Sequence, residues 1–146
     1  MKALSVKQPY AEFIATGEKS VELRTWQTGY RGPLLICSSA SGVLTKPRGK
    51  AAKAQWEAEF PDGVSVCVVD LADIVPYPSR GEDPKIAEDF AVNSGEMSLC
   101  NMCGEEFDPK AFEYEGFAWL LENPRRVENP FPVKGKLNLF EVDFEI

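Results

Sequence analysis

The sequence predicts an α+β fold, a small mixed β-barrel with two or three flanking helices. Short apolar or alternating runs recur along the chain, and turns rich in glycine or proline separate them. Two other segments have the residue spacing or the composition of helices. The length of 146 residues suits one domain, so residues 1–146 are expected to form a single domain.

The first forty residues predict three strands and one helix. The helix begins after Pro9, because proline is well tolerated in the first turn, and Gly17 is a suitable C-terminal cap. Its apolar stripe consists of Tyr10, Phe13 and Ile14. The predicted strands are residues 2–6, 20–26 and 33–37.

The remainder of the chain predicts a second helix, then strands on either side of an irregular insertion. The helix covers residues 46–60, which are rich in alanine. The insertion, about residues 76–112, is rich in proline, glycine and charge, with a short helix expected at 84–91. The predicted strands are 64–72, 117–121, a short one near 125–127, and 137–144.

The composition excludes several kinds of chemistry. The chain contains no histidine, which excludes Ser/His/Asp and Cys/His nucleophile systems and histidine-ligated metal sites. Four cysteines are too few for a disulfide framework. No apolar run is long enough to cross a membrane, and the amino-terminal residues lack the pattern of a signal peptide. We therefore expect a cytoplasmic protein with thiol cysteines and no membrane partner.

Charge is distributed unevenly along the chain. Residues 1–53 carry nine Lys or Arg and three Glu, a net charge of +6, within a chain whose total is −7. Such asymmetry is typical of a basic face on an acidic body, but the two halves could equally interleave and mix their charges on the surface.

One predicted strand face carries three side chains suited to recognition of a nucleobase. Period-two alternation over residues 20–26 places Glu22, Arg24 and Trp26 on the same face. A carboxylate accepts from the exocyclic amine of cytosine, a guanidinium binds phosphate or carbonyl oxygens, and an indole offers a stacking surface. The alternative is a solvent-facing strand on which Glu22 and Arg24 form a weak ion pair.

Motifs at both ends of the chain resemble those of the ASCH domain family. The opening motifs are Gln8-Pro9-Tyr10, Gly17-x-Lys19-x-x-Glu22-x-Arg24, Tyr30-Arg31-Gly32 and Ser38-Ser39. The later ones are Gly116-Phe117-Ala118-Trp119 with Glu122-Asn123-Pro124, and Pro132-x-Lys134-Gly135-x-Leu137-x-Leu139-Phe140. The stretch 76–112 matches none of them and is expected to be specific to a subgroup.

This resemblance implies a PUA-like pseudobarrel with a cleft between the first helix and the barrel. It also implies binding of RNA or a modified nucleoside. One branch of the family consists of small amidohydrolases that act on N4-acetylcytidine through a Lys, a Thr and a Glu. Lys19 matches that lysine, but Glu22 stands in place of the threonine, which favours binding over hydrolysis. The alternative is an amidohydrolase in which Glu22 activates water and Lys19 stabilises the oxyanion.

The candidate ligand-binding residues follow from these motifs. They are Gln8, Tyr10, Lys19, Glu22, Arg24, Trp26, Tyr30, Arg31 and Ser38. Three of them could instead have purely structural roles. Tyr10 could pack in the core, Arg31 could shape a turn, and Ser38 could end a strand. A nucleic-acid patch is expected from the basic residues Lys46, Arg48, Lys50 and Lys53.

The cysteine pair Cys100-x-x-Cys103 has the spacing of a zinc knuckle, but a structural site needs four ligands and the chain has no histidine. Cys37 and Cys67 lie in apolar runs and are expected to be core thiols. We therefore expect no metal and no cofactor.

A third functional alternative is a protein-interaction domain that uses the acidic insertion. The protein is expected to be a monomer.

Overall fold

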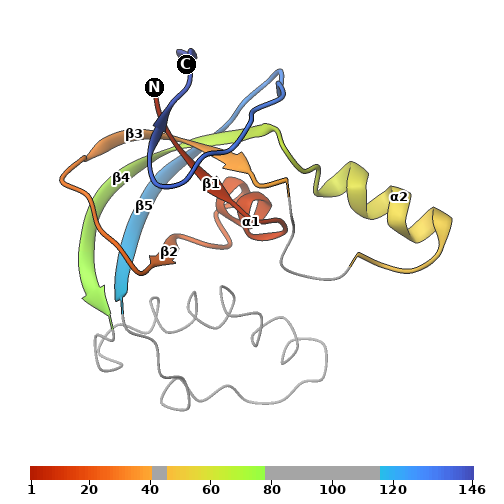
Figure 1. Ribbon diagram of the computed structural model, residues 1–146, viewed down its shortest axis with the longest axis horizontal. Coiled ribbons are helices and arrows are strands. Elements are labelled where there is room, and N and C mark those ends of the chain that lie inside the picture. Colours follow the sequence, from red (N-terminus) through yellow and green to blue (C-terminus); the bar gives the residue numbers. More distant parts are fainter. Residues whose placement is uncertain (41–45, 78–115) are drawn as a thin grey trace. The chain divides into compact units, whose positions relative to one another are not determined.

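The computed structural model of the chain describes residues 1–40, 46–77 and 116–146 (Figure 1). These residues form two compact units, each assembled from separate stretches of chain. Unit 1 contains Met1–Glu18, Pro33–Asp70 and Asn123–Ile146, and unit 2 contains Lys19–Gly32 and the described part of Leu71–Glu122. The predicted helix at 84–91, most of the insertion and the Cys100-x-x-Cys103 pair lie outside the described residues.

The α+β prediction is confirmed, since the described residues contain two helices and one mixed sheet. The helices are α1 (Tyr10–Thr16) and α2 (Lys50–Glu59). The strands are β1 (Lys2–Val6), β2 (Val21–Arg24), β3 (Gly32–Ser38), β4 (Ser65–Tyr77), β5 (Gly116–Arg126) and β6 (Phe140–Glu141), in the sheet order β2-β5-β4-β3-β1-β6. β4 and β5 run through both units.

Unit 1 is organised around β1, which pairs with β3 in parallel and with β6 in antiparallel. Its core cluster consists of Ala3, Leu35, Cys37, Val68, Val127 and Phe140, all at most 8% exposed. Burial of this apolar surface stabilises the unit. α1 ends as predicted, because Gly17 takes φ 85° and donates its N–H to the carbonyl of Ile14.

Unit 2 contains β2, which pairs with β5 in antiparallel. Glu22 lies opposite Trp119 and Arg24 opposite Phe117, so these four side chains share one face of the sheet. Val21 and Leu23 point to the other face and are 2% and 4% exposed. The predicted alternation of this strand is therefore confirmed for Val21–Arg24.

Several predicted strand boundaries were wrong. β2 ends at Arg24, so Trp26 lies beyond it. The two strands expected at 117–121 and 125–127 form the single strand β5, which continues through Asn123 (φ 52°) and the exposed Pro124. The residues of β5 that pair with β2 are 117–120, so the missing N–H of Pro124 costs no bond to β2. The strand expected at 137–144 is reduced to β6, since Asn138 also takes positive φ (60°) and Leu137 is 91% exposed.

No helix among residues 1–40, 46–77 and 116–146 is long and apolar enough to cross a membrane.

Candidate functional site

Three charged side chains of unit 2 are brought together around β2. The Nζ of Lys19 lies 3.9 Å from Oε1 of Glu22, and an Nη of Arg24 lies 3.6 Å from its Oε2. The Lys19 and Glu22 side chains are 0% and 3% exposed, whereas Arg24 is 26% exposed. We call these three residues the charged triad. Two cations surround one carboxylate, so the triad carries a net charge of +1.

The two carboxylate oxygens of Glu22 have different surroundings. Oε1 accepts the backbone N–H of Leu23 at 3.1 Å. Oε2 is buried and accepts no hydrogen bond from the part of the chain that the structure describes. Lys19 donates to the carbonyl of Val21, which fixes its ammonium at the start of the strand. Glu22 therefore presents one oxygen anchored to the backbone and one with unused acceptor capacity.

The burial of the charged triad overturns the alternative of a solvent-facing strand with a surface ion pair. Removing a lysine and a carboxylate from water costs several kcal/mol for each ion, and the attraction between the two ions seldom exceeds this desolvation cost. Apolar side chains of similar volume in these positions would give the fold equal or greater stability. The charged triad is therefore poorly explained by stability alone, which makes it a candidate for function.

One tryptophan, Trp119, lies beside the charged triad, and it contacts a second, Trp26. The Trp119 ring, directly across the strand pair from Glu22, is fully buried. Its Nε1–H donates to the carbonyl of Trp26 at 3.2 Å, and the two rings meet edge to face with centroids 4.8 Å apart. In the sequence, Trp119 stood out only as part of a family motif, and its position opposite Glu22 was missed. The motif containing Trp119 was the available signal, but only the β2–β5 register reveals the pairing.

The loop between β2 and β3 uses its arginine to hold its own shape. Arg31 donates through Nη1 to the carbonyls of Thr28 and Tyr30, both at 2.8 Å, and pairs with Asp73 at 3.4 Å. The side chain of Tyr30 lies over Gly32, where a Cβ would come within 3.5 Å of the tyrosine hydroxyl. These contacts agree with the structural role that the sequence left open for Arg31.

The remaining candidate ligand residues, Gln8, Tyr10 and Ser38, belong to unit 1 and make structural contacts there. Gln8 donates to the carbonyl of Pro61 at 3.1 Å, and its Oε1 accepts the N–H of Glu12 at 3.0 Å.

Tyr10 is 2% exposed and contacts the ring of Phe13. The Ser38 hydroxyl accepts the N–H of Val64 at 3.1 Å and donates to its carbonyl at 3.3 Å. The helix start and the strand end therefore account for the local roles of all three residues.

The four basic residues expected to form a patch differ in their surroundings. Lys46 pairs with Glu57 at 3.2 Å and Asp62 at 3.1 Å, and its hydrogen bond with Asp62 raises its pKa. Arg48, Lys50 and Lys53 are exposed, and none of the residues of α2 is buried. The patch stays a prediction, with three exposed cations and one lysine whose charge is already compensated.

The described residues contain no group of three or more Cys, Asp or Glu side chains arranged to hold a metal. Cys37 and Cys67 are both fully buried, which confirms them as core thiols, and burial raises the pKa of each to about 12. They stay protonated at neutral pH and are poor metal ligands and nucleophiles.

Comparison with known families and proteins gives a consistent result. A family model described as the ASCH domain matches residues 4–131. "Activating signal cointegrator 1" from Homo sapiens is 26% identical over 154 residues, covering 98% of this chain and 22% of that protein. The Mus musculus protein of the same name is 26% identical over 156 residues, with the same coverage. The chain thus spans about a fifth of the length of these relatives.

Among solved structures, the crystal structure of a mutant ZmASCH protein from Zymomonas mobilis is similar, with a TM-score of 0.53 and 13% identity. The match covers 97% of this chain and 88% of that chain. At this identity the likeness shows a shared fold.

Proposed function

The chain belongs to the ASCH domain family, and on that premise we propose that it binds RNA or a modified nucleoside through the charged triad of Lys19, Glu22 and Arg24. The observation that carries the proposal is the buried Oε2 of Glu22, a carboxylate oxygen that accepts no hydrogen bond from the described residues. A buried acceptor of this kind is costly to leave unsatisfied, and a donor on a ligand removes the cost.

The base that suits this acceptor carries an exocyclic amine. A carboxylate accepts from N4 of cytosine, and it rejects a carbonyl oxygen at the same position, as in uracil, because two acceptors would face each other. One of the two cations, Arg24, adds the complementary contact. Arg24 is 26% exposed and lies 3.6 Å from Glu22, so its guanidinium can meet a base carbonyl or a phosphate next to the amine.

The tryptophans define the apolar side of the proposed site. Trp26 is partly exposed and is held by the hydrogen bond and the edge-to-face contact with Trp119. A base can stack on the accessible part of the Trp26 ring while its polar edge reaches Glu22. Trp119 fixes the position of Trp26 and excludes water from the carboxylate.

For an RNA strand, the exposed Arg48, Lys50 and Lys53 supply phosphate contacts. Lys46 contributes less, because Glu57 and Asp62 already compensate its charge. The role assigned to this patch does not require it to recognise bases.

The proposal is tested by titrating ¹⁵N-labelled protein with cytidine, N4-acetylcytidine, uridine and a short single-stranded RNA. The chain has three tryptophans and therefore three indole N–H signals. We expect a cytidine compound to shift the indole signal of Trp119 and the amide of Leu23, which bonds to Glu22. In the three nucleoside titrations, Trp56 on α2 serves as the internal control, and the bound ligand also raises the melting temperature.

Shifts confined to other residues, or none at millimolar ligand, would refute a site at the charged triad. Release of acetate from N4-acetylcytidine in the same sample would assign Lys19 and Glu22 to the amidohydrolase alternative instead.

A further inference from the structure

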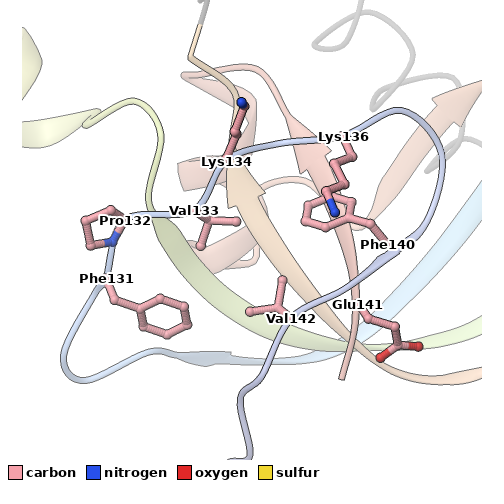
Figure 2. A pocket seen from close by; sticks show the side chains of 8 residues that line it. All are labelled: Phe131, Pro132, Val133, Lys134, Lys136, Phe140, Glu141 and Val142. Carbon is pink, nitrogen blue, oxygen red and sulfur yellow. The ribbon is translucent and has the colours of Figure 1, made fainter.

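A groove on unit 1 lies apart in sequence from the charged triad. It has a volume of about 260 Å³ and is formed by two runs of chain, Phe131–Lys136 and Phe140–Val142 (Figure 2). Phe131, Val133, Phe140 and Val142 give it an apolar lining, and all four belong to or contact the core cluster of unit 1. Lys134, Lys136 and Glu141 are the charged residues that line it.

Backbone hydrogen bonds hold both walls of the groove. Phe131 exchanges two bonds with Ser65, N–H to Oγ and carbonyl to N–H, both at 3.0 Å, and the N–H of Val133 reaches the carbonyl of Gly63 at 2.9 Å. On the other wall, Val142 exchanges two backbone bonds with Met1, at 2.8 and 3.0 Å. The groove is therefore formed before any partner arrives, which lowers the entropic cost of binding.

The charged residues that line the groove leave an uncompensated positive charge on its rim. Glu141 is compensated by the Nζ of Lys2 at 2.7 Å and by the amino terminus at 3.6 Å. Lys134 and Lys136 are exposed and form no ion pair within the described residues. An occupant that complements this rim carries negative charge on both sides of an apolar group.

The aromatic rings of the groove do not suit base stacking. Phe140 is 8% exposed, so its ring belongs to the core. The ring of Phe131 is tilted by 39° against that of Phe144 at a centroid distance of 5.5 Å, which covers part of it. Val133 and Val142 supply the rest of the apolar lining. An aliphatic side chain fits such a surface better than a planar base, which needs an open ring face.

The location of β6 favours an extended polypeptide. β6 is the last strand in the sheet order and pairs with β1 on one side, so no strand of the described residues covers its other edge. Extended peptides bind such edges through backbone hydrogen bonds, while pockets beside the edge select alternate side chains. The exposed Leu137 adds apolar surface on the same loop as the two lysines.

We propose that this groove is a docking site for an extended acidic peptide of a partner protein, with an aliphatic anchor between the valines and flanking Asp or Glu residues on Lys134 and Lys136. The inference is independent of the proposed function, since it uses different residues and a different ligand.

The test measures binding of a fluorescein-labelled nine-residue peptide with one central leucine and two Asp-Glu pairs on each side. We expect binding that shifts the amide signals of residues 131–142, and the variant with Lys134→Glu and Lys136→Glu should bind at least about tenfold more weakly. Lys7→Glu is the matched control, because Lys7 is exposed and does not line the groove. Replacing the peptide's leucine by serine should also reduce binding at least about tenfold, without changing the protein.

Three results would overturn the proposal. The first is equal affinity of the control and the double charge reversal. The second is an oligouridine that shifts residues 131–142 more strongly than the peptide does, which would make the groove a nucleic-acid contact. The third is a concentration-dependent dimer that the two charge reversals abolish, which would assign the groove to a second copy of this chain.

Discussion

Neutralising Glu22 is expected to destabilise the protein far more than neutralising a surface carboxylate. Glu22→Gln keeps the shape of the side chain but removes the negative charge between Lys19 and Arg24, whose cationic groups lie 3.9 and 3.6 Å from its oxygens. Because Lys19 is fully buried, its ammonium cannot turn into water when the counter-charge is lost. Breaking a buried pair in this way costs about 3–5 kcal/mol of the free energy of unfolding.

The structure also predicts how related substitutions rank. Lys19→Met leaves Glu22 paired with Arg24, so its cost is about 1–3 kcal/mol, mainly the hydrogen bond lost from the Val21 carbonyl. Combining Lys19→Met with Glu22→Leu removes both buried charges, and Arg24 can reach solvent. The double variant should therefore be more stable than Glu22→Gln alone, because paired removal of buried charges is often neutral or stabilising.

Urea denaturation followed by circular dichroism gives these free energies by linear extrapolation. Glu18→Gln is the matched control, since Glu18 is exposed and close to the same strand in sequence, and it should change stability by less than about 0.5 kcal/mol. If Glu22→Gln changed stability as little as Glu18→Gln does, the charged triad would be solvated and the reasoning from burial would fail.

Three further predictions concern other parts of the chain. Gly135→Ala would place a Cβ 2.8 Å from the Ser5 hydroxyl, so it should lower the free energy of unfolding, measured by urea denaturation, by about 1–3 kcal/mol. Adding Ser5→Ala should restore most of this stability, and absence of such rescue would contradict the contact. Cys37 and Cys67, with pKa values of about 12, should resist iodoacetamide at pH 8 in peptide mapping of the folded protein, whereas labelling at the rate of the unfolded chain would contradict their burial. Since these pKa values lie above the ordinary thiol value, their contribution to stability is complete below pH 9 and is lost as the pH rises toward 12. Charge reversal of Arg48, Lys50 and Lys53 should weaken RNA binding and flatten its salt dependence, while a salt-independent affinity would point to a neutral nucleoside.

Local patterns predicted the elements well where local interactions determine them. The helix after Pro9 ends at Gly17 because glycine adopts positive φ at little cost, and this can be read from the sequence. The alternation around Glu22 and Arg24 likewise placed both on one strand face, as the register confirms. Boundaries were wrong where asparagine adopts positive φ, at Asn123 and Asn138, since asparagine adopts this conformation only in some contexts.

The burial of the candidate site could not be predicted from local pattern. An alternating strand with charges on one face usually turns that face to water. Here Glu22 is 3% exposed because β2 pairs with β5, almost a hundred residues later in the chain, and this pairing places Trp119 beside the carboxylate. The hydrogen bond from Trp119 to the carbonyl of Trp26 is likewise a long-range contact. The sequence therefore singled out these residues as candidates, and the fold determines their environment.

The most direct test of base recognition by Glu22 compares cytidine and uridine as ligands of the wild-type protein and of Glu22→Gln. Each titration is done by calorimetry at low temperature, after circular dichroism has verified that the variant is folded. Glu22→Gln is expected to weaken cytidine binding by about 1–3 kcal/mol, because an acceptor for the exocyclic amine becomes a donor, while uridine binding changes much less. Equal affinity of the two proteins for cytidine and for every derivative tested would contradict recognition of a base by Glu22.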